Sequence, residues 1–279
     1  MRRIALATED RLPDGIEDDE LAFPFLRELG LEPAFVSWED ADADWAAFDA
    51  VILRSTWNYT LRYPAFRAWL ESLPVPVYNP LDVVRWNTDK RYLFDLAAHV
   101  PVIPTLPLED PEMLGEALAS VGWTQAVVKP IIGAGARNTW RVRPENLAEV
   151  SARLAETREA MLLQPFVPEI AEKGEWSLLF FDGAYSHALL KRAAPGDFRV
   201  QEDFGGEVIP SAAPGALVEV AERVLQSVGT ALVYARIDLV ESAAGPLLVE
   251  AELVEPELFL RCHPEAPRRF AEAVARRLG

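Results

Sequence analysis

The sequence predicts an α/β N-terminal region followed by two α+β regions. Short apolar runs alternate with helical patterns up to about residue 80, which is typical of parallel βαβ units. Residues 125–142 then predict a strand, a glycine-containing loop and another strand. Beyond residue 174, most apolar runs are expected to pair as neighbouring strands, with helices packed against them.

The N-terminal region is expected to contain four strands and two helices. The strands are predicted at 4–8, 33–38, 49–55 and 75–79, and the helices at 18–29 and 63–73. Gly30 ends the first helix, and proline and turn residues between 74 and 80 close the region. We therefore place the first domain at residues 1–82.

The second and third domains are predicted at residues 83–160 and 161–279. In the second, helices at 89–99, 111–121 and 144–159 accompany the strand–loop–strand unit. The third is expected to contain strands at 161–167, 175–183, 185–193, 231–241 and 246–255, and helices at 215–229 and 264–278.

The composition excludes several functional classes. The net charge of −17 repels polyphosphate backbones and argues against nucleic acid as the main partner. No apolar run is long enough to span a membrane, and the N-terminus lacks the features of a cleavable leader. The single cysteine, Cys262, excludes an internal disulfide framework and fits a reducing cytoplasm, where we expect the protein to reside.

Lysine is rare in this chain, which uses arginine as its usual surface cation. Of the 27 basic residues only four are lysines, Lys90, Lys129, Lys173 and Lys191. A lysine ammonium is a compact point charge that suits phosphate oxygens, whereas arginine presents a planar fork. We expect three of the four in one site, although their survival by chance remains an open alternative.

Three carboxylates are predicted on one face of a hairpin near the C-terminus. Residues 242–246 form a predicted turn, and pairing of Glu241 with Leu247 would place Asp238 directly opposite Glu250. Glu252 would share this face, because strand side chains alternate. Directly opposed carboxylates lie about 4.5–5.5 Å apart and repel one another unless a cation intervenes.

Magnesium is the cation that such a cluster favours. It is a hard ion that prefers a few carboxylates together with substrate phosphates. The alternative is a solvent-facing acidic strand that Arg236 and bulk ions neutralise.

The glycine loop offers a second phosphate-binding element. Residues 133–137 have neither the Gly-Lys-Ser/Thr ending of a P-loop nor a following helix, so two familiar phosphate motifs are excluded. A mobile hairpin tip with Gly133 and Gly135 can close its backbone amides over phosphates. Lys129 supports this prediction, because apolar strands rarely end in a buried, unpaired ammonium. A plain β-turn is the alternative.

Two further segments carry candidate site residues. The strand at 161–167 leads into a proline-bounded linker that can present backbone groups to an adenine, with Glu169 near the ribose. Lys191 and Arg199 lie in a glycine-rich segment that suits an anionic phosphate and a carboxylate. A common strand ending and a solvated surface loop are the respective alternatives.

Seven segments occur in an order that resembles the ATP-grasp superfamily. They are LRSTWNY, RWNTDKRYL, VVKPIIGAGAR, LLQPF, SLLFFDGAYSHALLK, GDFRVQ and VEAELVEPELF, and together they span most of the chain. The likeness is to the prokaryotic glutathione synthetase-like branch, and within it to the O-ureidoserine cyclo-ligases of cycloserine biosynthesis. It implies an α/β preATP-grasp domain followed by α+β ATP-grasp subdomains that clamp ATP, and a homodimer.

The resemblance also assigns roles to individual residues. Contacts to the nucleotide are implied for Lys90, Lys129, Gln164, Phe166, Val167, Glu169, Glu175 and Lys191. One or two Mg²⁺ ions are implied at Asp238, Glu250 and Glu252, although many relatives have asparagine at the position of Glu252. Arg199 is implied beside the reacting carboxylate.

The acceptor substrate is expected at the end of the third N-terminal strand. Ligands of open α/β sheets gather at the carboxyl ends of strands, and the resemblance places a substrate there too. The candidates are Arg54, Ser55 and Asn58. The alternative for Arg54 is that it merely caps its strand near acidic residues.

The expected function is that of an ATP-dependent ligase. A small amino-acid-like carboxylate would attack ATP to give an acyl phosphate, and an amine would then displace phosphate to form an amide. Arg199 and Lys191 are the catalytic candidates. The overall likeness favours intramolecular cyclisation, with an intermolecular dipeptide-type ligase as one alternative and a non-catalytic ATP-binding sensor as the other.

Overall fold

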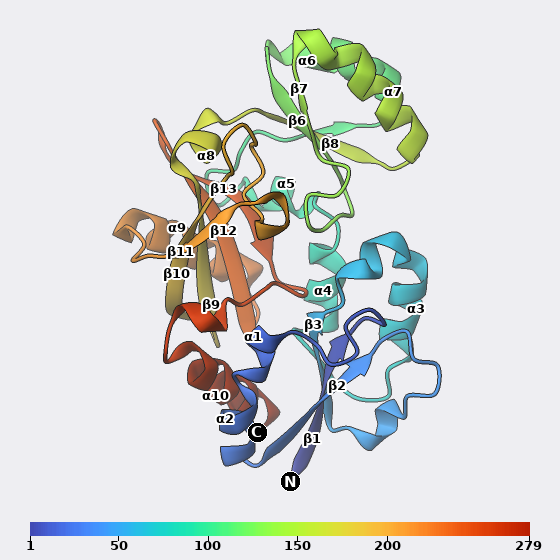
Figure 1. Cartoon of the computed structure of the whole chain (residues 1–279), viewed down its shortest axis with the longest axis vertical. Coiled ribbons are helices and arrows are strands. Elements are labelled where there is room, and N and C mark those ends of the chain that lie inside the picture. The colour runs from blue at the N-terminus through green and yellow to red at the C-terminus, as the bar shows by residue number, and fades with distance from the viewer.

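The N-terminal region contains a four-stranded parallel sheet in the order β2-β1-β3-β4 (Figure 1). The computed structural model describes all residues from 1 to 279. The strands are β1 (Arg2–Thr8), β2 (Leu31–Ser37), β3 (Ala50–Ser55) and β4 (Val77–Tyr78). All residues of β3 are buried, as expected of a parallel strand covered on both faces. The predicted parallel α/β arrangement is confirmed.

The helices of this region are shorter than predicted. They are α1 (Glu17–Glu20), α2 (Phe23–Glu28) and α3 (Tyr63–Ser72), with short 3-10 helices η1 (Trp45–Ala47) and η2 (Trp57–Leu61). The prediction of a single helix at 18–29 is therefore wrong, because the helical segment is interrupted between α1 and α2. Pro24 lies in the first turn of α2, the position in a helix where a residue without an N–H is tolerated.

The middle sheet has the order β5-β8-β6-β7 and lies at the top of Figure 1. Its elements are β5 (Leu106–Leu108), η3 (Pro111–Met113), α6 (Leu114–Val121), β6 (Ala126–Pro130), β7 (Trp140–Val142), η4 (Pro144–Asn146), α7 (Leu147–Thr157) and β8 (Met161–Pro165). Since β8 pairs with both β5 and β6, this sheet extends past the boundary placed at residue 160.

The third sheet is five-stranded and antiparallel, with the order β11-β10-β9-β12-β13. Its elements are α8 (Pro168–Lys173), β9 (Glu175–Phe181), β10 (Ala184–Arg192), η5 (Glu202–Phe204), β11 (Glu207–Pro210), α9 (Gly215–Val228), β12 (Tyr234–Ser242) and β13 (Gly245–Glu252). Two helices from before the middle sheet, α4 (Leu81–Asn87) and α5 (Tyr92–Leu96), share a buried apolar cluster with this sheet and α9. The sequence did not predict α4, and α5 is shorter than the helix expected at 89–99.

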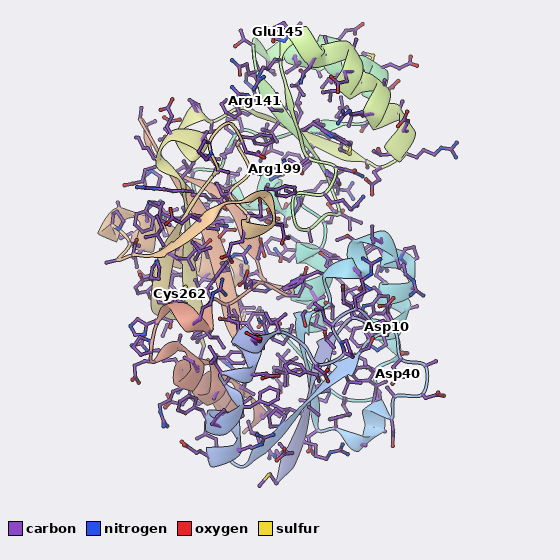
Figure 2. The ribbon with its side chains drawn as sticks, viewed as in Figure 1. Asp10, Asp40, Arg141, Glu145, Arg199 and Cys262 are labelled. Atoms are coloured by element: carbon purple, nitrogen blue, oxygen red, sulfur yellow. The ribbon has the colours of Figure 1, made fainter.

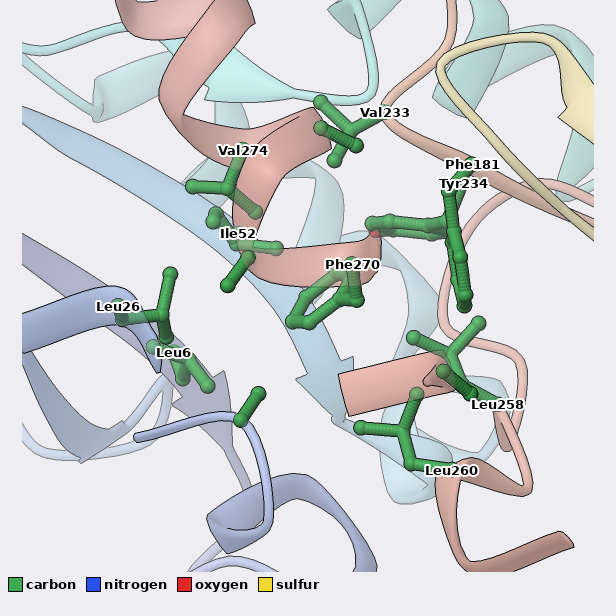
Figure 3. Close-up of a cluster of buried hydrophobic side chains, with 14 of the residues drawn as sticks. Leu6, Leu26, Ile52, Phe181, Val233, Tyr234, Leu258, Leu260, Phe270 and Val274 are labelled. Atoms are coloured by element: carbon green, nitrogen blue, oxygen red, sulfur yellow. The ribbon is translucent and has the colours of Figure 1, made fainter. Parts of the chain in front are cut away.

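The C-terminal helix returns to the N-terminal region. The chain after β13 passes through η6 (Leu260–Cys262) into α10 (Ala266–Leu278). Leu6, Leu26 and Ile52 share one buried cluster with Phe270 and Val274, as Figure 3 shows. The first and last segments of the chain therefore form one hydrophobic core. No helix of the protein combines the length and apolarity needed to cross a bilayer.

A β-bulge sets the register of the β12–β13 hairpin. Near the turn Glu241 pairs with Pro246, so the predicted partner Leu247 is wrong by one residue. The register shifts between Asp238 and Leu239, and Asp238 then pairs with Glu250 as predicted. The extra residue of the bulge restores the expected opposition of these two acids, at a place where bulges commonly re-aim side chains.

His187, a buried residue of β10, makes the stability of the protein sensitive to acid. The buried Nε2 donates to the carbonyls of Leu258 and Phe259 at 3.2 and 3.1 Å, and burial lowers the pKa of His187 to about 4. Because the unfolded ring titrates near pH 6.5, we expect stability to be full above that pH and to fall by about 3 kcal/mol as the pH drops to 4. Urea unfolding at pH 7 and at pH 4 should show a smaller loss of unfolding free energy for His187→Gln than for the wild-type protein. An equal difference in both proteins would contradict this origin.

Candidate active site

A cavity of about 520 Å³ lies where the three sheets meet. Its lining comes from η2, the glycine loop, β6, β8, the loop after β10 and the inner face of the large sheet. Figure 2 shows Arg199 on a loop between the middle sheet and the large sheet, which is the five-stranded third sheet. Segments far apart in sequence therefore meet at a single concave site, the usual geometry of a ligand pocket.

The floor of the cavity is a buried charged face on β9, β10 and β12. The ammonium of Lys191 lies 2.6 Å from Glu175 and 3.3 Å from Asp238. Ser177 lies opposite Asp238 on the neighbouring strand and donates its hydroxyl to that carboxylate at 2.5 Å. All four side chains are buried, so the charges of Lys191, Glu175 and Asp238 act on one another with little screening.

Arg236 is a site residue that the sequence analysis treated only as a neutralising charge. Its guanidinium pairs with Asp238 at 3.2 Å and also with Glu252. Burial alone would lower the pKa of Arg236, but these two acids raise it above its ordinary value. Its place two residues before Asp238 on the same strand put it on the same face, and that spacing could have identified it.

Two of the three remaining lysines also reach the cavity. Lys90 forms a salt bridge with Glu250. Lys129 is only 8% exposed and lines the cavity, and burial lowers its pKa. Its ammonium makes no hydrogen bond or salt bridge with another residue. Together with Lys191 they bring three of the four lysines to one site, as expected, while Lys173 lies outside on the surface.

The predicted metal ligands share the cavity, but each already faces a cation. Asp238, Glu250 and Glu252 pair with Arg236, Lys90 or Lys191, and no group of three acidic, histidine or cysteine side chains surrounds one point. Burial raises the pKa of Glu252 to about 7 in spite of Arg236. All three carboxylates line the cavity, which fits a magnesium ion held by a few carboxylates and by phosphates rather than by a protein cage.

The residues implied in adenine binding line the cavity at the end of β8. Gln164, Phe166 and Val167 are all part of the lining. The Arg141 guanidinium lies 3.5 Å from the centroid of the Phe166 ring, and the Phe166 N–H donates to the carbonyl of Gln125. This end of the cavity thus combines an aromatic side chain with a fixed backbone.

The two acids implied near the nucleotide differ in position. Glu175 lines the cavity, where Lys191 neutralises it. Glu169 does not line the cavity. Its carboxylate accepts from the Ala243 N–H at 3.3 Å, because the expected linker folds as helix α8 and directs this side chain toward the β12–β13 turn.

The glycine loop and Arg199 both line the cavity. Gly133 and Gly135 belong to the lining, and Gly135 has a φ of +58°, which favours glycine. Glu159 anchors the loop through Arg137 at 2.6 Å and Asn138 at 2.8 Å. The loop, which we predicted to be mobile, is therefore held at its C-terminal end by hydrogen bonds to Glu159.

Arg199 reaches the cavity from the loop after β10. It pairs with Asp197 at 2.7 Å and lies 3.6 Å from the centroid of the Phe204 ring. Hydrogen bonds from Arg199 lower the pKa of Asp197 to about 2, so this pair is fully charged at neutral pH.

The substrate residues predicted in the N-terminal region are not brought to the cavity. Arg54 is 1% exposed and donates to Asp19 at 2.8 Å and to the carbonyl of Pro256 at 3.0 Å. Ser55 is buried against Thr8.

Asn58 also points away from the cavity. It bonds to Glu39 through its side chain and accepts from the Trp38 indole. Its neighbours in η2, Trp57 and Tyr59, line the cavity instead. The strand-end rule thus located a segment that reaches the cavity, but not the side chains of that segment that line it.

The 253–259 segment, which follows β13, is fixed by side chains. Every backbone carbonyl from residue 253 to residue 259 accepts a hydrogen bond from a side chain. The donors, in chain order of the carbonyls, are Asn79, Tyr234, Trp57, Arg54, Arg236 and His187. Arg54 therefore acts on the cavity only indirectly, by fixing the backbone of its wall, while Trp57 both fixes that backbone and lines the cavity.

Comparison with known proteins identifies the family. The model of the family "D-cycloserine synthetase DcsG, N-terminal domain" matches residues 4–79. The cycloserine biosynthesis protein DcsG of Streptomyces lavendulae is 37% identical over 278 residues, which cover 90% of this chain and 91% of that protein.

Solved structures give the same assignment. The crystal structure of D-cycloserine synthetase DcsG superimposes with a TM-score of 0.88 at 33% identity, over 99% of this chain and 100% of that one. A RimK domain ATP-grasp protein from Sphaerobacter thermophilus shares the fold, with a TM-score of 0.72 at 22% identity over 98% and 99% of the two chains. The chain therefore belongs to the DcsG family of ATP-grasp ligases, which are ATP-dependent enzymes.

Proposed function

We propose that this ligase activates the carboxylate of a small amino-acid-like substrate as an acyl phosphate and then closes it on its own amine. The observation that supports this most strongly is Lys129, a buried ammonium without a protein partner in a cavity that also holds Lys90, Lys191 and Arg236. A buried, unpaired cation is unfavourable unless an anion binds beside it. A triphosphate supplies that anion.

The nucleotide would lie between the middle sheet and the large sheet. Gln164, Phe166 and Val167 would contact the adenine, while Lys90 and Lys129 would contact the phosphates from the opposite end. Gly133 and Gly135 would present backbone amides to the same phosphates. This arrangement uses each lining element according to its chemistry.

One or two magnesium ions would be held by Asp238, Glu250 and Glu252. When bound, the metal would neutralise phosphate charge that the lysines alone do not balance. Lys90 and Arg236, which together pair with all three of these acids in the structure, would then be free to turn toward phosphate oxygens. Arg236 is thereby added to Lys191 and Arg199 as a catalytic candidate.

The chemistry proceeds in two displacements. A carboxylate oxygen attacks the γ-phosphorus and the bond to ADP breaks, giving the acyl phosphate. The amine nitrogen then attacks the carbonyl carbon, the C–O bond to phosphate breaks, and the nitrogen loses a proton. Arg199, Lys191 and Arg236 would stabilise the charge on the transferring group and on the tetrahedral oxygen. The glycine loop would exclude water that could hydrolyse the intermediate.

Replacing Lys129 with methionine is expected to raise the KM for ATP about 10- to 100-fold, because a charge-assisted contact to phosphate is lost. Steady-state kinetics with varied ATP measures this effect. Lys173→Met, at an exposed lysine outside the cavity, is the matched control and should retain the wild-type KM. An unchanged KM in the Lys129 variant would remove this residue from the nucleotide site.

A phosphate-release screen tests the proposed function. Amino acids and O-ureidoserine are supplied with ATP and Mg²⁺, and the product mass is measured for each acid that releases phosphate. We expect release that requires the carboxylate, and a product that is one water lighter than a single substrate. Release that needs a second amine would instead indicate the intermolecular ligase. ATP binding without turnover on any carboxylate would leave the sensor alternative.

A further inference from the structure

Glu255 is the one acid of the cavity wall in the 250–257 stretch that lacks a partner. Glu250, Glu252 and Glu257 each pair with a cation, Lys90, Arg236 and Arg261 respectively. Glu255 is 8% exposed and lines the cavity, yet no other side chain donates a hydrogen bond to its carboxylate and no salt bridge reaches it. A buried carboxylate in this condition is costly and is stabilised by a cation that enters the cavity.

The backbone at Glu255 is held firmly from both sides. Its own carbonyl accepts from the Trp57 indole at 3.1 Å. The carbonyls before and after it accept from the Tyr234 hydroxyl at 2.7 Å and the Arg54 guanidinium at 3.0 Å. Three side chains therefore fix the point from which the Glu255 carboxylate enters the cavity, as a preorganised binding group requires.

Aromatic side chains border the same part of the cavity. Trp57 and Tyr59 line it from η2. Burial raises the pKa of Tyr59, and the charges of Glu255, Glu250 and Glu252, which line the same cavity, raise it further. A carboxylate beside aromatic rings is a chemistry that recognises organic ammonium groups.

We propose that Glu255, with Trp57 and Tyr59, binds the primary ammonium group of the substrate, a nitrogen other than the one that closes the ring. This inference rests on the proposed function, since it concerns the acid that the enzyme activates. The cations of the charged floor attract the substrate carboxylate, while Glu255 attracts the ammonium. The substrate is thereby oriented with its carboxylate toward the nucleotide, which is the alignment that phosphoryl transfer needs.

The test measures the preference for an ammonium group directly. Alanine and O-ureidoserine are compared with propionate and the desamino analogue of O-ureidoserine, by calorimetry with a non-hydrolysable ATP analogue and Mg²⁺ and by phosphate release. The wild-type protein is expected to bind at least one amino form about tenfold or more tightly than its desamino partner. Glu255→Gln should reduce this preference to less than about twofold, mainly by weakening the amino form.

Two variants control the interpretation. Glu255→Asp keeps the charge and should retain part of the preference, which shows that its loss in Glu255→Gln is not a folding defect. Glu257→Gln changes an acid of the same wall that Arg261 already neutralises and should keep the wild-type preference. Thermal unfolding of all variants is measured alongside.

Three results would overturn the inference. In the first, the wild-type protein does not distinguish amino from desamino acids. In the second, Glu255→Gln keeps the full preference. In the third, Glu255→Gln needs more Mg²⁺ for activity while its preference is unchanged. The last result would assign Glu255 to the metal. A Glu255-dependent preference without any carboxylate-dependent phosphate release would instead preserve the ammonium site and reject the proposed function.

Discussion

Replacing Asp238 with asparagine is expected to lower the rate of carboxylate-dependent phosphate release by about a thousandfold or more. Asp238 is buried at the centre of the charged floor and pairs with both Lys191 and Arg236. The substitution removes the charge that positions these two cations and a proposed ligand of the magnesium ion, so several contributions to transition-state stabilisation are lost together. Single-turnover kinetics with saturating ATP and Mg²⁺ measures the effect.

The matched control is Glu241→Gln on the same strand. Glu241 lies outside the cavity, where it accepts from the Trp176 indole at 3.3 Å. We expect its variant to keep the wild-type rate, and circular dichroism to show that both variants are folded under the assay conditions. An active Asp238→Asn enzyme would show that β12 does not carry the chemistry.

Replacing Arg54 with methionine is expected to destabilise the protein by about 3–5 kcal/mol, because Asp19 would be left buried without its cation. The pair lies at 2.8 Å with both side chains at or below 1% exposure. The same change removes the donor to the Pro256 carbonyl, so the cavity wall loses one of its fixed points. Urea unfolding measures the loss, which is a large fraction of the stability of a typical domain.

Two further variants separate the charge from the contact. Arg54→Lys keeps the positive charge and should lose less stability than Arg54→Met. The double variant Arg54→Met, Asp19→Leu removes both charges and should recover much of the loss. A fully stable Arg54→Met protein with a raised KM for the carboxylate would contradict the structural role and restore Arg54 as a substrate residue.

The sequence predicted the fold class and the location of the charged floor because both depend on local patterns. Alternating strands and helices identify a parallel sheet, and the two-residue period of strands places Asp238, Glu250 and Glu252 on one face. The bulge after Asp238 could not be predicted, since it depends on how β12 and β13 twist in the folded sheet. Here the wrong pairing near the turn left the final opposition unchanged.

The residues that the sequence analysis misplaced or missed mostly depend on distant partners. Nothing near Arg54 in sequence indicates that Asp19 will neutralise it in the core. Likewise Glu255 becomes distinctive only because Trp57, Tyr234 and Arg54 fix its backbone while no cation forms a salt bridge with its carboxylate. Arg236 was within reach of the sequence argument, since its spacing from Asp238 places it on the same face.

The central claim is that the charged cavity transfers the γ-phosphoryl group of ATP to a substrate carboxylate. O-ureidoserine labelled with ¹⁸O in its carboxylate tests this most directly, with the released phosphate analysed by mass spectrometry. The account predicts one ¹⁸O atom in each phosphate, because the acyl phosphate breaks between carbon and the labelled oxygen. Released phosphate that carries no label would contradict it.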